Sequence, residues 1–313
     1  MAERVTGSFV ALITPMNADY GVDFAGFADL LEFQRGAGTS AVLIMGSSGE
    51  VTMLSPEERH AIVRETMKHR RDGMQQWYGC TGPTTEATID YVRQAAAEGA
   101  DGAVIAAPSY ICAPNADIVR FFLEVADASP IPIGIYNNPP RVKTDLDVDD
   151  VLAIAAHGNV TVLKESTARV GQVGRVCAAA PDVSIMCCCS PNLGLVVPTM
   201  SLGGHGTANM TGNIIPREMA VISTPWDDDG AQALRFREAY LANLPMLHFV
   251  YSAINPVPVK TLMRAVGLPA GPLRRPLQPL DEAGLRRGVE IVAQLGLDRS
   301  YGYRTGSAAL AAE

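Results

Sequence analysis

The chain has 313 residues, enough for one large α/β domain with a short appendage. Its formal net charge of -8 and its pI near 5.2 exclude a surface that would attract nucleic acid or an anionic membrane, so a small molecule is the expected partner. No signal-peptide pattern opens the sequence, and no apolar run reaches the roughly 18 to 20 residues of a membrane span, so a cytoplasmic protein is expected.

Short apolar or β-branched runs alternate with helix-length amphipathic stretches as far as about residue 208. Each gap between two runs has room for one helix, which is the rhythm of an α/β fold of the (β/α)8 type, the TIM barrel. The eight predicted strands span residues 9–14, 41–45, 77–80, 102–107, 131–136, 160–164, 183–187 and 204–208.

Helix signals in the gaps support this fold. Ser55, Pro56 and Glu58 have the spacing of an N-cap, a first-turn proline and a capping-box glutamate. They predict a helix that starts there and runs towards residue 70. Residues 23–34 and 116–126 have apolar spacing that also favours helix.

The pattern becomes purely helical after the eighth strand. Further helices are predicted over residues 215–223, 229–253, 257–266 and 281–295. We therefore expect the barrel over residues 1–225 and a small C-terminal helical extension over 226–297. Residues 298–313 are rich in Gly, Ser and Ala and are expected to form a loosely ordered tail.

Lys164, one of only four lysines, lies at the end of the sixth predicted strand, where a solvated cation has little reason to lie. Burial of an ammonium favours the neutral amine, and a neutral amine can attack a carbonyl to form a Schiff base. The segment alone leaves a second interpretation open, a structural lysine paired with a carboxylate at the strand end.

The six cysteines and five histidines do not predict a metal site. No C-x-x-C pair with a distant partner and no histidine pair at i, i+4 is present. Neighbouring strand residues point to opposite faces, so the run from Cys187 to Cys189 is better interpreted as reduced thiols packed as small apolar side chains. Neither a metal nor a cofactor is expected.

Polar residues follow several of the predicted strands at their carboxyl ends, where barrel enzymes carry their chemistry. A glycine-bounded turn at residues 46–50 follows the second strand and offers amides and hydroxyls to a carboxylate, although an ordinary polar turn would look the same. Tyr110 follows the fourth strand, Tyr136 ends the fifth, and Lys164 ends the sixth. Two phenols and an amine therefore share one rim.

Taken together, these motifs resemble those of the dihydrodipicolinate synthase and N-acetylneuraminate lyase family, class I aldolases and lyases that form a lysine Schiff base. The resemblance covers nearly the whole chain. Its motifs are Gly-Ser-Ser-Gly-Glu at 46–50, Tyr-Asn-Asn-Pro at 136–139, Lys-Glu-Ser at 164–166 and Leu-Gly-Gly-His-Gly at 202–206.

The resemblance implies four catalytic residues. Lys164 would condense with pyruvate or another 2-oxo acid, and the resulting iminium would act as the electron sink. Tyr136 would transfer protons to and from the substrate, while Ser47 and Tyr110 would complete the proton relay. Residues that match Tyr110 commonly reach across a tight dimer interface, which implies a homodimer or a homotetramer.

The resemblance also implies four substrate-binding residues. Gly46 and Ser48 would hold the carboxylate of the 2-oxo acid, and Ala208 at the end of the eighth strand would line the site. Arg141 matches the position that binds the carboxylate of the second substrate in the synthases, a role that suits the guanidinium fork. A surface salt bridge is the alternative for Arg141.

The sequence departs from the synthase pattern around the second substrate. Val142 and Lys143 stand where synthases have threonine and glycine, Asn138 replaces an apolar residue, Pro191 replaces a glycine, and Ser109 replaces a tyrosine. Three functions therefore stay open. They are 4-hydroxy-tetrahydrodipicolinate synthesis from pyruvate and aspartate semialdehyde; a catabolic aldolase, dehydratase or deaminase of a different 2-oxo acid through the same iminium; and a non-catalytic barrel that binds a small acid.

Overall fold

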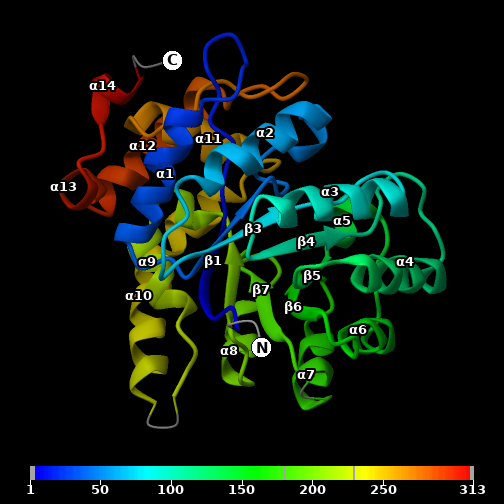
Figure 1. Ribbon diagram of the computed structural model, residues 1–313. Helices are drawn as coiled ribbons and strands as arrows, with labels where there is room; N and C mark the ends of the chain where they lie inside the picture. The colour runs from blue at the N-terminus through cyan, green and yellow to red at the C-terminus, as the bar shows by residue number, and fades with distance from the viewer. Residues whose placement is uncertain (1–3, 180, 228–229, 311–313) are drawn as a thin grey trace.

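The computed structural model describes residues 4–179, 181–227 and 230–310, and its centre is a closed barrel of eight parallel strands in sequence order (Figure 1). This confirms the predicted (β/α)8 fold, and every strand overlaps its predicted range. The strands are β1 Gly7–Ala11, β2 Ala41–Ile44, β3 Gln75–Gly79, β4 Gly102–Ala106, β5 Ile133–Asn137, β6 Val160–Glu165, β7 Ser184–Cys188 and β8 Gly206–Asn209.

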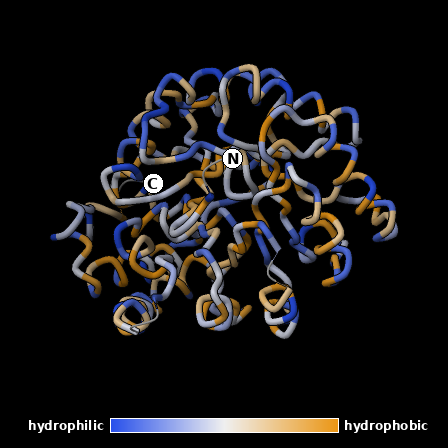
Figure 2. The backbone as a smooth tube through the Cα atoms, turned by 60° about the horizontal axis from the view of Figure 1, so that its bottom comes forward, coloured by the Kyte–Doolittle hydropathy of each residue, from blue (hydrophilic) through white to orange (hydrophobic). Residues whose placement is uncertain are grey.

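Helices cover the outside of the barrel and connect successive strands. They are α1 Phe24–Gly36, α2 Pro56–Met67, α3 Thr85–Ala97, α4 Asn115–Ala128, α6 Val148–Ala155, α7 Val170–Ala179, α8 Val196–Ser201 and α9 Pro216–Ser223, with the short α5 Pro139–Val142 after β5. The predicted capping box at the start of α2 is confirmed, because Ser55 accepts from the Glu58 amide and the Glu58 carboxylate accepts from the Ser55 amide. Figure 2 shows hydrophobic and hydrophilic residues alternating along the peripheral helices, as expected for helices with one buried face.

Large side chains fill the interior of the barrel. The rings of Phe9 and Trp77 pack edge to face at 6.1 Å, and Leu43, Val162 and Met186 belong to the same buried cluster. Gly102 makes room for the indole, because a Cβ at that position would lie 2.4 Å from the Trp77 ring. A filled interior leaves the open ends of the strands as the place for a ligand.

The helical extension predicted after the barrel is present. It contains α10 Ala231–Val250, α11 Val257–Val266 and α12 Glu282–Gln294. One apolar cluster contains Ile13 from the loop after β1, Phe236 from α10, Leu262 from α11 and Val292 from α12. The extension is therefore packed on the barrel through a shared hydrophobic core, which is the dominant source of favourable folding energy.

The prediction of a loosely ordered tail is wrong for residues 298–310. Two further helices, α13 Leu297–Tyr301 and α14 Gly306–Leu310, follow α12, and α13 lies beside α1 (Figure 1). Tyr303 is buried, and its hydroxyl donates to the Ile214 carbonyl. The tail is rich in Gly, Ser and Ala, but its few large side chains pack on the C-terminal apolar cluster and order it. Residues 311–313 lie outside the described residues.

Candidate active site

The carboxyl ends of the strands surround a cleft with two connected lobes. The lobe over β5 to β8 has a volume of about 280 Å³, and the lobe over β2 to β5 has a volume of about 530 Å³. Both are lined by Ser47, Tyr136, Asn138 and Arg141, which mark where they meet. Six of the eight predicted site residues line the smaller lobe or its mouth: Lys164, Tyr136, Ser47, Ser48, Arg141 and Ala208.

Lys164 is 97% buried on β6 and points into the smaller lobe. Its register partner on β5 is Tyr136, and Nζ lies 4.2 Å from the centre of the phenol ring. Among the described residues, no carboxylate or other polar group forms an ion pair or hydrogen bond with this nitrogen. The interpretation of Lys164 as the structural partner of a carboxylate therefore does not fit the structure.

Asn138 sets the hydrogen bonding of the Tyr136 hydroxyl. The side-chain amide nitrogen of Asn138 donates to the phenol oxygen of Tyr136. The proton of the phenol hydroxyl is therefore not used in this contact and can be donated to another group. A phenol that accepts from an amide and keeps its own proton available is suited to proton transfer. From the sequence, Asn138 was identified only as a departure from the synthase pattern. The structure shows that its side chain contacts the Tyr136 hydroxyl.

Glu165 lies behind Lys164, on the outer face of β6. Its carboxylate accepts from the Asn137 side chain, the Thr167 amide and the Gln172 side chain. Burial raises the pKa of Glu165 to about 7, although the hydrogen bonds from Thr167 and Asn137 lower it. The contacts join the ends of β5 and β6 and thereby fix the strand that carries Lys164.

The turn of residues 46–50 has a conformation that few residues adopt readily. Glu50 has a φ of 54°, and a Cβ at Gly49 would lie 3.1 Å from the Met45 backbone. The turn is held from outside by a buried ion pair, in which Lys260 Nζ lies 2.6 Å from the Glu50 carboxylate and both side chains are fully buried. The Arg274 amide donates to the other carboxylate oxygen at 2.8 Å.

Three buried polar atoms in the smaller lobe have no hydrogen-bond partner among the described residues. They are the hydroxyls of Ser48 and Ser166 and the side-chain oxygen of Asn255. Buried polar groups in native proteins are nearly always satisfied, so these three atoms mark a place where water or a polar ligand can bind. Ser47 is not part of this set, because its hydroxyl accepts from the Asn255 amide at 3.3 Å.

Arg141 lies at the mouth of the cleft, on α5. Its guanidinium donates to the Asn255 carbonyl at 2.8 Å, and the side chain is otherwise exposed. No carboxylate among the described residues forms an ion pair with it, so the alternative of a surface salt bridge does not fit. The neighbouring Val142 is buried and lines the larger lobe, whereas Lys143 is exposed.

Tyr110 lies outside the cleft of its own chain. The side chain is 95% exposed, the backbone φ is 79°, and Ile111 beside it is 60% exposed. Ser109, one residue earlier, does line the larger lobe. A single chain therefore brings together seven of the eight predicted site residues and leaves Tyr110 pointing to solvent.

The chain matches the sequence profile of the Dihydrodipicolinate synthetase family over residues 4–295. It belongs to this family. The 4-hydroxy-tetrahydrodipicolinate synthase of Gluconacetobacter diazotrophicus is 33% identical over 93% of this chain and 97% of its own length. The enzyme of that name from Anaeromyxobacter dehalogenans is 32% identical over 94% and 98%.

Solved structures of the family have the same fold. The crystal structure of dihydrodipicolinate synthase from Aquifex aeolicus superposes with a TM-score of 0.86 at 27% identity, covering 94% of this chain and 99% of that chain. Among the described residues, no helix is long and apolar enough to cross a membrane. The same residues contain no group of three His, Cys, Asp or Glu side chains arranged to hold a metal ion.

Sequence reasoning missed the contribution of the C-terminal extension to the site. Asn255 and Tyr251 both line the smaller lobe, and they come from the segment between α10 and α11. Cys188 also lines it, and Cys188 Sγ and the buried Cys189 Sγ lie 3.3 and 3.2 Å from the Tyr251 hydroxyl. The sequence predicted these cysteines only as reduced thiols packed as small apolar side chains, and no local signal identified Tyr251.

Proposed function

We propose that this protein is a class I lyase that forms a Schiff base between Lys164 and pyruvate, and that it acts as a 4-hydroxy-tetrahydrodipicolinate synthase. The observation that carries the proposal is the buried, unpaired amine of Lys164 against Tyr136, facing a cavity with three unsatisfied polar atoms. Membership of the Dihydrodipicolinate synthetase family and the names of the relatives support it.

The first chemical step is attack of the Lys164 nitrogen on the ketone carbon of pyruvate. The carbonyl oxygen takes up two protons, one given up by the amine and one supplied from outside, and leaves as water; Tyr136 is placed to transfer them. The resulting iminium draws electrons from the neighbouring carbon, so the methyl group loses a proton to give an enamine. The enamine carbon then attacks the aldehyde of aspartate semialdehyde to form the new carbon–carbon bond, and the aldehyde oxygen takes up a proton to become a hydroxyl. This addition regenerates the iminium, and attack of a nucleophile on its carbon releases the product from Lys164.

Two of the unsatisfied atoms of the smaller lobe, the hydroxyls of Ser48 and Ser166, can donate to the carboxylate of pyruvate. A carboxylate accepts hydrogen bonds, and the Ser48 hydroxyl and the amides of the turn from Gly46 are donors beside it. Ala208 leaves space at the wall of β8. Arg141 at the mouth has a free side of its guanidinium, which suits the carboxylate of the second substrate.

The proton relay is completed by a second copy of the chain. The exposed side chains of Tyr110 and Ile111 form an apolar projection. We infer that Tyr110 enters the cleft of the neighbouring chain in a homodimer. Two such homodimers can associate into a homotetramer. Mixing Tyr110→Phe chains with Lys164→Ala chains tests this. Mixed dimers would regain one intact site, whereas a mixture as inactive as its components would refute the shared site.

Reduction with sodium borohydride in the presence of pyruvate tests the mechanism. Intact-mass and peptide mass spectrometry should find a reduced pyruvate adduct on Lys164 and none on the Lys164→Ala protein. An unmodified wild-type protein, with pyruvate and with longer 2-oxo acids, would refute the Schiff base and favour a barrel that only binds a small acid. Lys68→Ala is the matched control, because Lys68 is exposed and far from the cleft.

A catabolic reaction through the same iminium is the second candidate. Val142, which stands where the synthases have threonine, lies in the wall of the larger lobe and gives the cleft a shape that differs from the synthase pattern. Turnover of pyruvate plus aspartate semialdehyde should be compared with that of a panel of hydroxylated 2-oxo acids. Faster turnover of any panel member would replace the synthase assignment and keep Lys164 as the nucleophile.

A further inference from the structure

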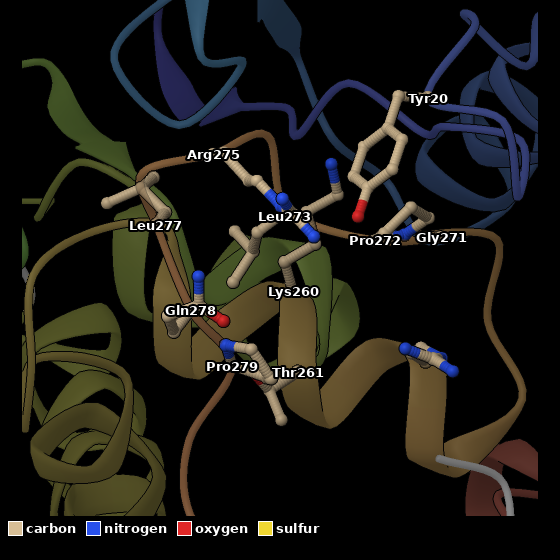
Figure 3. A pocket seen from close by; sticks show the side chains of 11 residues that line it. Tyr20, Lys260, Thr261, Gly271, Pro272, Leu273, Arg275, Leu277, Gln278 and Pro279 are labelled. Carbon is tan, nitrogen blue, oxygen red and sulfur yellow. The ribbon is translucent and has the colours of Figure 1, made fainter.

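A separate cavity of about 170 Å³ lies between α11 and the segment of residues 267–280 that leads to α12 (Figure 3). We call it the connector pocket. Lys260, Thr261 and Arg264 line it from α11, Arg275 and Gln278 from the connecting segment. None of its lining residues lines either lobe of the catalytic cleft, so it is a distinct site.

The charge of the connector pocket is entirely positive. Lys260, Arg264 and Arg275 line it and no acidic residue does, although the whole chain has a net charge of -8. Lys260 is neutralised by Glu50. The two arginines are not neutralised, because neither guanidinium has an ion pair or hydrogen bond within the part of the chain that the structure describes.

Arg274, which lies between Arg264 and Arg275 in the sequence, differs from them because its guanidinium is paired. Its guanidinium forms an ion pair with Glu58 and donates to the carbonyls of Met53 and Tyr20. Arg275 follows it directly and faces the pocket, and Arg264 is half-buried on the opposite wall. Two unpaired guanidinium groups on one small cavity, inside an acidic protein, concentrate a positive field.

Neutral donors also line the connector pocket, beside apolar residues of the connecting segment. Tyr20 comes from the loop before α1, and Gln278 comes from the connecting segment (Figure 3). Neither the phenol hydroxyl nor the side-chain amide has a partner among the described residues. The Tyr20 backbone is nevertheless fixed, since its carbonyl accepts from Arg274 and its amide donates to Asn17. The Tyr20 hydroxyl is thus presented by a backbone segment that hydrogen bonds hold in place.

The size of the cavity limits the ligand. Pockets for drug-sized molecules span about 300 to 1,000 Å³, so about 170 Å³ admits only a compact group. Guanidinium groups bind planar or tetrahedral oxyanions through paired N–H donors. We propose that the connector pocket binds a small multivalent oxyanion of the size of phosphate, held by Arg264 and Arg275 with Tyr20 and Gln278 as neutral donors.

Isothermal titration calorimetry at constant ionic strength tests the proposal, with inorganic phosphate and succinate as probes. Wild-type protein should bind at least one of them at a single saturable site, and the Arg264→Gln/Arg275→Gln double variant should bind it at least tenfold more weakly. Arg286→Gln is the matched control, because Arg286 is an exposed arginine already paired with Glu282. Its affinity should equal that of the wild type.

The two probes separate the possible sources of the anion. Tighter binding of phosphate would identify a phosphate or phosphate ester, and tighter binding of succinate would identify a dicarboxylate. Absence of saturable binding by both would overturn the proposal, and so would equal affinities of the wild type and the double variant. An unchanged melting temperature of the double variant in anion-free buffer shows that it is folded, so that weak binding reports on the pocket.

Discussion

The Lys164 nitrogen lies 4.2 Å above the centre of the Tyr136 ring, and the two residues are register partners on adjacent strands. Their spacing is therefore set by the hydrogen-bonded ladder of the barrel and not by a loop. A nucleophile and a proton donor on neighbouring rigid strands keep their relative position through a reaction, which is the main requirement for efficient positioning.

Replacement of Tyr136 by Phe keeps the ring beside Lys164 and removes only the hydroxyl. We expect kcat for the synthase reaction to fall by about 10² to 10⁴, the usual contribution of a general acid–base group. Tyr240→Phe is the control, since that half-buried ring stacks on Phe236 away from the cleft. If the steady-state kcat values of the two variants were within twofold of each other, Tyr136 would not be part of the proton relay.

Replacement of Asn138 by Val removes the donor to the Tyr136 hydroxyl with little change of volume. The loss of one hydrogen bond of about 0.5 to 1.5 kcal/mol predicts a fall in kcat of about two- to tenfold. The KM for pyruvate should stay constant, because Asn138 acts through Tyr136. A changed KM with an unchanged kcat would show instead that Asn138 contacts the substrate directly.

Replacement of Lys260 by Met leaves the Glu50 carboxylate buried without its cation. We expect the free energy of unfolding to fall by about 3 to 5 kcal/mol, as for other broken buried ion pairs. Arg286→Ala breaks the exposed pair with Glu282 and should cost about 0.5 kcal/mol or less. Urea titrations of both variants measure the free energy of unfolding. Equal losses in the two variants would contradict the prediction that the buried ion pair contributes more than the exposed one.

Glu165 should make stability depend on pH between about 4.5 and 7. Its pKa is raised in the folded protein, so the folded state binds the proton more tightly than the unfolded state does. Its contribution is fully present below its unfolded pKa and is lost as the pH rises through about 7, on the order of 3 kcal/mol in all. Urea unfolding of Glu165→Gln should lack this slope, whereas Glu282→Gln should keep it.

The cysteines should differ strongly in reactivity. Cys112 is exposed and should be alkylated first by iodoacetamide at neutral pH. Burial raises the pKa of Cys80 to about 12 and also raises the pKa values of Cys187 and Cys189, so these thiols should stay unmodified in the native protein. Peptide mass spectrometry against time gives the order, and early labelling of Cys187 would contradict the packing.

The fold could be predicted from the sequence because its signals are local. Each strand is a short apolar run, and the start of α2 is specified within Ser55 to Glu58. The tail could not be predicted from composition, since its order depends on contacts of Tyr303 with Ile214, far away in the chain. Local patterns carry no information about such distant partners.

The same limit applies to the site. Lys164 and Tyr136 were predictable because both end strands, and strand ends meet at one rim of a barrel. Asn255 was not, because its contacts with Ser47 and Arg141 join residues more than a hundred positions apart. The hydrogen bond from Asn138 to Tyr136 was missed for another reason, since the amide orientation depends on the fold of the short helix α5.

The ion pair that shapes the turn of Ser47 and Ser48 joins residues 210 positions apart. A chain emerging from the ribosome completes β2 long before it contains Lys260, and its N-terminal part begins to fold first. During this interval Glu50 has no cation, so the turn lacks the contact that fixes its shape. Only a chain synthesised beyond α11, with α11 docked, holds Lys164 and an ordered turn together, which places the onset of catalysis late in synthesis.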